Sequence, residues 1–180
     1  MTGPSSAGSP RLYLIGLMGS GKSTVGRKLA ATLGRPYLDN DAIIATLAGR
    51  STVALAELGG TVLHDWESHY VQYLAADQPV PFVAGIAAST ADRPADLATL
   101  RRSGMLVYLR SAPDVLAGRI DRDQPRPWIT GGSAALIERM YRRRDPVLSA
   151  ECDVVVDATA APDQVRDGIL AALAEPGAPP

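Results

Sequence analysis

The chain has few of the residues that characterise secreted, membrane-spanning or nucleic-acid-binding proteins. It has one cysteine, Cys152, which excludes an internal disulfide. Arg, Asp or Gly interrupts every apolar run before it reaches the roughly 20 residues that cross a bilayer. The formal net charge of −1 provides no overall basic field for collecting nucleic-acid phosphates. Since no secretory signal is visible either, we expect a cytoplasmic protein that binds neither membrane nor nucleic acid.

What the sequence contains is an alternation of two kinds of segment. Short apolar runs at 12–16, 36–39, 80–85, 105–110 and 152–158 predict strands buried on both faces. Longer amphipathic runs, which begin near residues 22, 41, 61, 94, 113, 133 and 162, predict helices. The alternation indicates an α/β fold of three layers, with a five-stranded parallel sheet and helices on both faces.

The 180 residues are enough for one domain, which we place at 11–175. The ends, 1–10 and 176–180, consist mostly of Pro, Gly, Ser and Ala and predict disordered tails. Two segments exceed the simple pattern. Residues 41–76 are helical for twice the length of one crossover, which predicts a substrate-binding insertion. Residues 121–132 are polar and rich in turn formers, which predicts a mobile lid.

A glycine-rich loop follows the first predicted strand. Gly16, Gly21, Lys22 and Ser23 satisfy the pattern G-x-x-x-x-G-K-[ST], with a strand before it and a helix after it, as a nucleoside triphosphate site requires. Lys22 is expected to reach the β and γ phosphates, and Ser23 to offer its hydroxyl to Mg²⁺. The predicted nucleotide-binding residues of this loop are Gly19, Ser20, Gly21, Lys22, Ser23 and Thr24.

The stretch "GLMGSGKSTVGRKLAATLGRPYLDNDAI", residues 16–44, resembles the opening of the shikimate kinase family. The resemblance implies a small P-loop kinase that uses ATP and Mg²⁺ to phosphorylate a hydroxyl of a small-molecule acceptor. It also implies that Asp39 acts through water on Mg²⁺ and that Asp41 is a catalytic residue that binds the acceptor's hydroxyls. Two carboxylates at i and i+2 beside a triphosphate agree with these roles. We expect a monomer or a weak homodimer.

Two later segments carry the resemblance further. "DQPRPWI" is similar to the family's lid motif, which implies that Arg126 contacts the transferring phosphoryl group and that Arg119, seven residues earlier, packs on adenine. "RRRDPVLSAECD" resembles the segment whose arginine grips the shikimate carboxylate, and this assigns that role to Arg144.

The acceptor side departs from the family in two places. The family's second carboxylate-binding arginine is replaced by Asp65 in one alignment, and by His64, with Glu67 following, when one gap is allowed. The family's three glycines after the middle strand are reduced to Gly85, followed by Ile86, whose side chain is expected to crowd the acceptor.

These departures make shikimate a doubtful acceptor. With Asp65 facing the substrate, we expect a cyclitol, an aminocyclitol or a hydroxy amino acid instead. The alternatives are a genuine shikimate kinase, another P-loop kinase such as a gluconate or nucleotide kinase, and an inactive nucleotide-binding module.

Overall fold

The computed structural model describes residues 10–76, 79–123 and 133–174. Some of the predictions lie outside these residues. They are the tails, apart from Pro10, and the lid residues 124–132, among them Arg126. The helix that precedes the lid continues to Asp123, so the first three residues of the predicted lid are helical.

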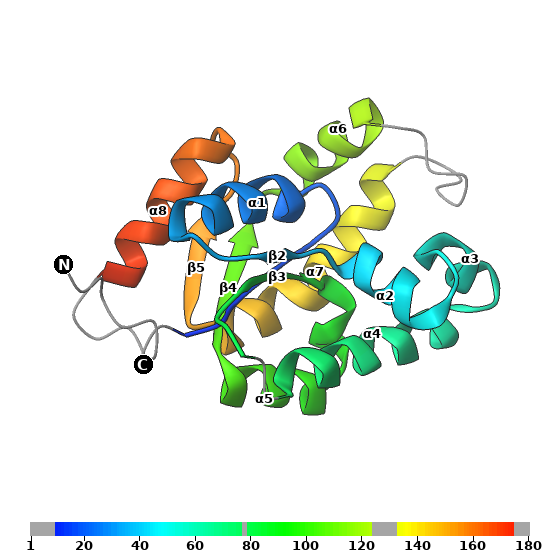
Figure 1. Cartoon of the computed structure of the whole chain (residues 1–180). Coiled ribbons are helices and arrows are strands. Elements are labelled where there is room, and N and C mark those ends of the chain that lie inside the picture. The colour runs from blue at the N-terminus through cyan, green and yellow to red at the C-terminus, as the bar shows by residue number, and fades with distance from the viewer. Residues whose placement is uncertain (1–9, 77–78, 124–132, 175–180) are drawn as a thin grey trace.

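A parallel sheet forms the middle layer of the fold (Figure 1). Within the described residues it has five strands in the order β2-β3-β1-β4-β5, which confirms the predicted sheet. The strands are β1 (Leu12–Gly16), β2 (Tyr37–Leu38), β3 (Val83–Ala87), β4 (Met105–Arg110) and β5 (Val154–Asp157). β3 starts later than the predicted 80–85 run, after Pro81, which has no N–H to donate to a neighbouring strand.

Helices cover both faces of the sheet, as Figure 1 shows. On one face lie α1 (Lys22–Leu33) and α8 (Pro162–Ala174), and on the other lie α4 (Gly60–Ala75), α5 (Pro94–Ser103) and α7 (Ser133–Glu151). The remaining helices are α2 (Asn40–Ala48), α3 (Thr52–Glu57), the 3₁₀ helix η2 (Ala88–Asp92) and α6 (Pro113–Asp123). No helix among residues 10–76, 79–123 and 133–174 has the length and apolar character of a membrane span.

Alternating side chains of the central strand supply two separate cores. Leu12 and Leu14 of β1 pack towards α1 and α8, whereas Tyr13 and Ile15 pack towards α4, α5 and α7. This burial on both faces explains the unbroken apolar run. The same expectation is wrong for β5, an edge strand of the described sheet. Val154 and Val156 pack against the core on the side of α1 and α8, whereas Val155 belongs to neither core and is 44% exposed.

The predicted helical insertion lies between β2 and β3 and contains three helices, α2, α3 and α4, rather than two. α2 ends at Gly49, which adopts a left-handed conformation with φ 66°. The short helix α3 then begins at Thr52 and is capped by Ser51, whose hydroxyl accepts from the N–H of Ala54 at 3.1 Å. The insertion places α2 and α4 beside the carboxyl ends of the central strands.

Candidate active site

A cleft of about 900 Å³ opens at the carboxyl ends of the strands, where parallel α/β sheets bind ligands. One end is formed by the glycine loop between β1 and α1. The other end is formed by α2, α4, the end of β3, η2 and α7. Most of the predicted site residues line this cleft, namely Gly19, Gly21, Lys22, Ser23, Thr24, Asp39, Asp41, Gly85 and Arg144.

The glycine loop has the backbone that an anion site requires. Gly19 and Gly21 adopt φ values of 81° and 87°, which side-chain-bearing residues rarely adopt, and Gly21 directly precedes α1. The ammonium group of Lys22 donates to the carbonyls of Gly16 at 2.6 Å and Leu17 at 3.1 Å. Lys22 is therefore held over the loop, within reach of a bound triphosphate.

Ser20 is placed differently from the rest of the loop. Its side chain is buried, it does not line the cleft, and its N–H donates to the Leu17 carbonyl at 3.1 Å. In this arrangement Ser20 closes the loop, and its predicted contact with the nucleotide remains a prediction.

Ser23 and Asp39 form a pair of hard oxygen donors at the start of the cleft. The Ser23 hydroxyl donates to Asp39 Oδ2 at 3.0 Å, and Asp39 also caps α2 by accepting from the N–H of Asp41 at 3.2 Å. Mg²⁺ prefers such donors and commonly takes one or two protein ligands, completing its shell with water and phosphate oxygens. The pair therefore fits Mg²⁺. No group of three or more His, Cys, Asp or Glu side chains in the described part of the chain could hold a metal by itself.

Arg119, on α6, lies beside the glycine loop and does not line the cleft. Its guanidinium group donates to the carbonyls of Gly19 at 3.3 Å and Thr159 at 3.0 Å. Arg119 thus links the glycine loop to the segment that follows β5. This position is compatible with the predicted adenine contact, which remains a prediction.

We call the end of the cleft formed by α2, α4, η2 and α7 the acceptor end, because the predicted acceptor-binding residues lie there. The structure brings together Asp41, His64, Glu67 and Arg144 at this end, from three separate helices. The Ser89 hydroxyl donates to Glu67 Oε2 at 2.5 Å. Burial raises the pKa of Glu67, against this hydrogen bond and the nearby His64 and Arg144. Among the described residues that line it, this end of the cleft therefore holds two carboxylates, Asp41 and Glu67, beside one arginine, Arg144.

The expectation that Asp65 contacts the acceptor is corrected by its place on α4. His64 and Glu67, three residues apart, share the helix face that lines the cleft. Asp65 lies outside the lining, is 58% exposed, and pairs with Arg93 Nη2 at 2.9 Å. His64, the alternative from the gapped alignment, takes the position facing the cleft.

Ile86 also differs from the expectation. Successive side chains on a strand point to opposite faces, so Gly85 and Ala87 line the cleft, whereas Ile86 is buried in the core on the side of α4 and α5. Ile86 therefore cannot crowd an acceptor.

Among the residues that the sequence did not predict are Tyr37 and Ser89, which line the cleft, and Asp92, which contacts Arg144 from outside the lining. Tyr37 lines the cleft, and its hydroxyl lies 2.7 Å from the position that a Cβ on Gly85 would take. Asp92 pairs with Arg144 at 2.8 Å. Tyr37 lies in a short apolar run that predicts a strand, and nothing in that run marks it as a site residue. No regular spacing in the sequence connects Ser89 with Glu67, or Asp92 with Arg144.

Comparisons with known proteins show the family to which the chain belongs. The family model described as shikimate kinase matches residues 18–174. The shikimate kinase of Paracidovorax citrulli is 34% identical over 147 residues, which cover 81% of this chain and 80% of the relative. The shikimate kinase of Burkholderia pseudomallei is 35% identical over 153 residues, covering 84% of this chain and 82% of the relative.

Solved structures show the same relationship. The shikimate kinase from Acinetobacter baumannii in complex with shikimate superposes with a TM-score of 0.85 at 25% identity, covering 94% of this chain and 97% of that one. The enzyme from Aquifex aeolicus gives a TM-score of 0.77 at 26% identity, with 91% and 95% covered. The predictions of the P-loop kinase fold, of ATP and Mg²⁺ as cofactors, and of a phosphotransferase acting on a hydroxyl are confirmed at the level of the family. The chain belongs to the shikimate kinase family.

Proposed function

We propose that this chain transfers the γ-phosphate of ATP to a hydroxyl of shikimate, bound between α2, α4 and α7. One observation carries the proposal: Asp41 and Arg144 line the same cleft as Lys22, so a ring held by the first two lies next to the phosphate end of the nucleotide site. The printed description of the Acinetobacter baumannii relative, a complex with shikimate, supports this choice of acceptor.

We assign a role in that transfer to four residues that line the cleft, Lys22, Ser23, Asp39 and Asp41. Lys22 and the N-terminus of α1 stabilise the negative charge on the phosphoryl oxygens. Ser23 and Asp39 would hold Mg²⁺, which would neutralise charge on the phosphates. The Asp41 carboxylate accepts a hydrogen bond from the attacking hydroxyl and favours the loss of its proton. The role of Arg126 on the transferring group remains a prediction, since this residue lies outside those described.

The carboxylate of bound shikimate would contact Arg144 and His64, which both line the cleft. A histidine offers single N–H contacts where arginine offers a bidentate fork, so this clamp is weaker than two arginines. Loss of one partner of such a contact costs about 2–5 kcal/mol.

A second candidate is a related acceptor without an overall negative charge, such as a cyclitol, an aminocyclitol or a hydroxy amino acid. The observation that favours it is the acidic character of this end, where Asp41 and Glu67 line the cleft with Arg144, and Asp92 pairs with Arg144. Acidic side chains bind amines and accept hydrogen bonds from hydroxyls, and they repel a carboxylate.

ADP release from Mg²⁺-ATP, measured against shikimate and the neutral or amine-bearing acceptors, tests both candidates. Shikimate-dependent ADP release supports the proposal. Release with only the other acceptors supports the second candidate. If nucleotide binds, as measured by calorimetry, and no acceptor releases ADP, both are wrong and the chain is a nucleotide-binding module. The Lys22→Ala variant provides the blank.

A further inference from the structure

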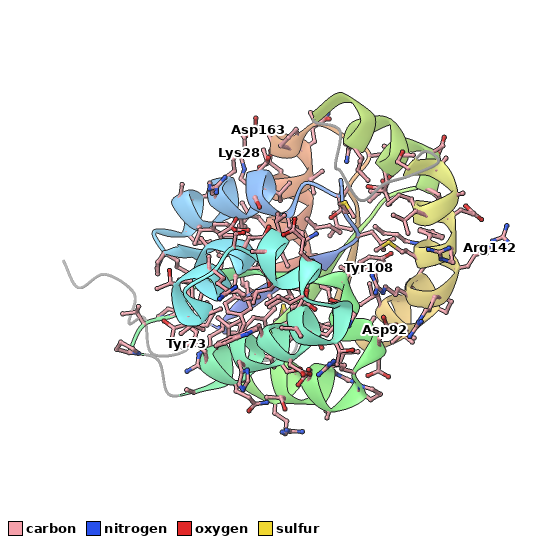
Figure 2. The ribbon with its side chains drawn as sticks, turned by 90° about the vertical axis from the view of Figure 1, so that its right-hand side faces the viewer. Lys28, Tyr73, Asp92, Tyr108, Arg142 and Asp163 are labelled. Atoms are coloured by element: carbon pink, nitrogen blue, oxygen red, sulfur yellow. The ribbon has the colours of Figure 1, made fainter. Side chains whose placement is uncertain are left out.

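Arg144, the arginine of the acceptor end, is already bound to a carboxylate of the protein. Its Nε and Nη2 atoms both donate to Oδ2 of Asp92, at 3.1 Å and 2.8 Å. Both side chains are largely buried, with 12% of Arg144 and 17% of Asp92 exposed. Asp92 closes η2, and Figure 2 labels it where η2 meets α7.

The contact occupies the edge of the guanidinium that planar anions use. Nε and Nη2 form the fork that binds carboxylates side by side with two parallel hydrogen bonds. An acceptor carboxylate that approaches Arg144 must either displace Asp92 or bind through the remaining N–H groups.

A second arginine holds Asp92 from the exposed side. Arg143 Nε donates to Asp92 Oδ1 at 2.8 Å, and the Arg143 side chain is 70% exposed. Burial raises the pKa of Asp92, but the hydrogen bonds and charges of Arg144 and Arg143 hold it below its usual range. Asp92 is therefore ionised at neutral pH, and Arg144 and Arg143 share its charge.

We propose that Asp92 competes with the anionic group of an acceptor for Arg144, and so sets how strongly the enzyme discriminates between carboxylate-bearing and uncharged acceptors. The inference rests on the proposed function in one respect, that the acceptor binds in this cleft. Asp92 acts through Arg144 and is a positioning residue for specificity. The alternative, in which Asp92 only orients Arg144 for the acceptor, predicts the opposite result when its charge is removed.

The Asp92→Asn variant keeps the shape of the side chain and removes its charge. We expect the ratio of kcat/KM for shikimate to kcat/KM for a neutral cyclitol to rise roughly tenfold, because the ion pair that the acceptor must displace becomes a hydrogen bond from Arg144 to an uncharged amide. Calorimetric titration with shikimate in the presence of Mg²⁺-ADP is expected to show tighter binding by a similar factor.

Asp163→Asn is the matched control. Asp163 also holds two basic side chains, Lys28 at 3.0 Å and Arg166 at 2.8 Å, but on the exposed surface of α1 and α8 (Figure 2), away from the cleft. We expect neither the acceptor ratio nor the shikimate affinity to change in this variant.

Arg143→Gln provides a test in the other direction on an exposed side chain, which is useful if Asp92→Asn folds poorly. Without Arg143, the charge of Asp92 acts on Arg144 alone, and we expect the preference for shikimate to fall roughly two- to threefold. A rise in that preference would overturn the proposal.

The remaining outcomes separate the inference from the proposed function. Weaker or unchanged shikimate binding by Asp92→Asn overturns the inference, even if shikimate is the acceptor. Tighter shikimate binding by Asp92→Asn supports the inference. If shikimate binds in this way but neither the unmodified protein nor Asp92→Asn phosphorylates it, the inference stands and only the proposal that shikimate is the acceptor is wrong.

Discussion

We propose that Lys22 is the residue on which phosphoryl transfer depends most directly. Its ammonium group lies over the glycine loop through the carbonyls of Gly16 and Leu17. Replacing Lys22 by Ala removes a preorganised positive charge from the transferring phosphoryl group, and we expect kcat to fall by roughly 10²- to 10³-fold. ADP formation at saturating acceptor measures this loss.

Lys28→Ala is the control, since Lys28 is the only other lysine and pairs with Asp163 on the surface. We expect its kcat to match that of the unmodified protein. A Lys22→Ala enzyme with the normal melting temperature and more than about a tenth of the normal kcat would contradict the role of Lys22.

Gly85 and Tyr37 form a close contact that a single methyl group would disturb. A Cβ on Gly85 would lie 2.7 Å from the Tyr37 hydroxyl oxygen but 3.7 Å from Cζ, an ordinary contact. We expect Gly85→Ala to lower the free energy of unfolding by about 1–3 kcal/mol. In a Tyr37→Phe background the same change should cost much less, because the clashing oxygen is gone. Urea unfolding of the four proteins gives the coupling, and strictly additive effects would refute the contact.

At the scale of elements, the position of α7 depends on Asp145. Its carboxylate accepts from the Tyr108 hydroxyl at 3.0 Å and from Arg110 Nε at 2.8 Å, both on β4. Arg144 is the preceding residue, so this anchor also determines where Arg144 enters the cleft. We expect Asp145→Asn to lower the free energy of unfolding at pH 7 by about 1.5–3 kcal/mol, as measured by urea titration. Glu138→Gln, on the exposed surface of the same helix, should change it by less than about 0.5 kcal/mol.

The same anchor predicts how stability depends on acid. Burial raises the pKa of Asp145, but the hydrogen bonds from Arg110 and Tyr108 hold it below its ordinary value. A carboxyl whose pKa is lowered in the folded state stabilises the protein above its unfolded pKa of about 3.9, and the stabilisation is lost as the pH falls through the folded pKa. We expect the melting temperature to fall below about pH 4, and to fall less steeply in Asp145→Asn. Equal slopes for the two proteins would exclude Asp145 as a source of this dependence.

At the scale of the whole molecule, the cleft joins the glycine loop to α2, α4 and α7, so ligand binding links parts of the chain that are far apart in sequence. A ligand that binds only the folded state, at 100 times its Kd, stabilises by about 2.7 kcal/mol. We expect Mg²⁺-ADP at this excess to raise the melting temperature by roughly 5–10 °C. Chelating the metal should reduce the shift, and Lys22→Ala should reduce it further. No shift at saturating Mg²⁺-ADP would contradict nucleotide binding by this loop.

The sequence alone determined those parts of the protein that depend on neighbouring residues. The glycine loop, with the strand before it and the helix after it, depends only on neighbouring residues. Left-handed glycines and the N-terminus of the helix that follows produce the anion site within eight residues. The sheet and its helices followed from alternation and from burial on both faces.

The tertiary structure decided the acceptor end, where every feature depends on the exact orientation of elements distant in sequence. The rotation of α4 turns His64 and Glu67 into the cleft and Asp65 out of it, and the alternation along β3 buries Ile86. A shift of one residue in the alignment of α4 or in the register of β3 would reverse which side chains face the cleft. A single sequence does not determine that alignment or register. The pairing of Asp92 with Arg144 joins residues 52 positions apart, a contact that only the packing of η2 against α7 creates.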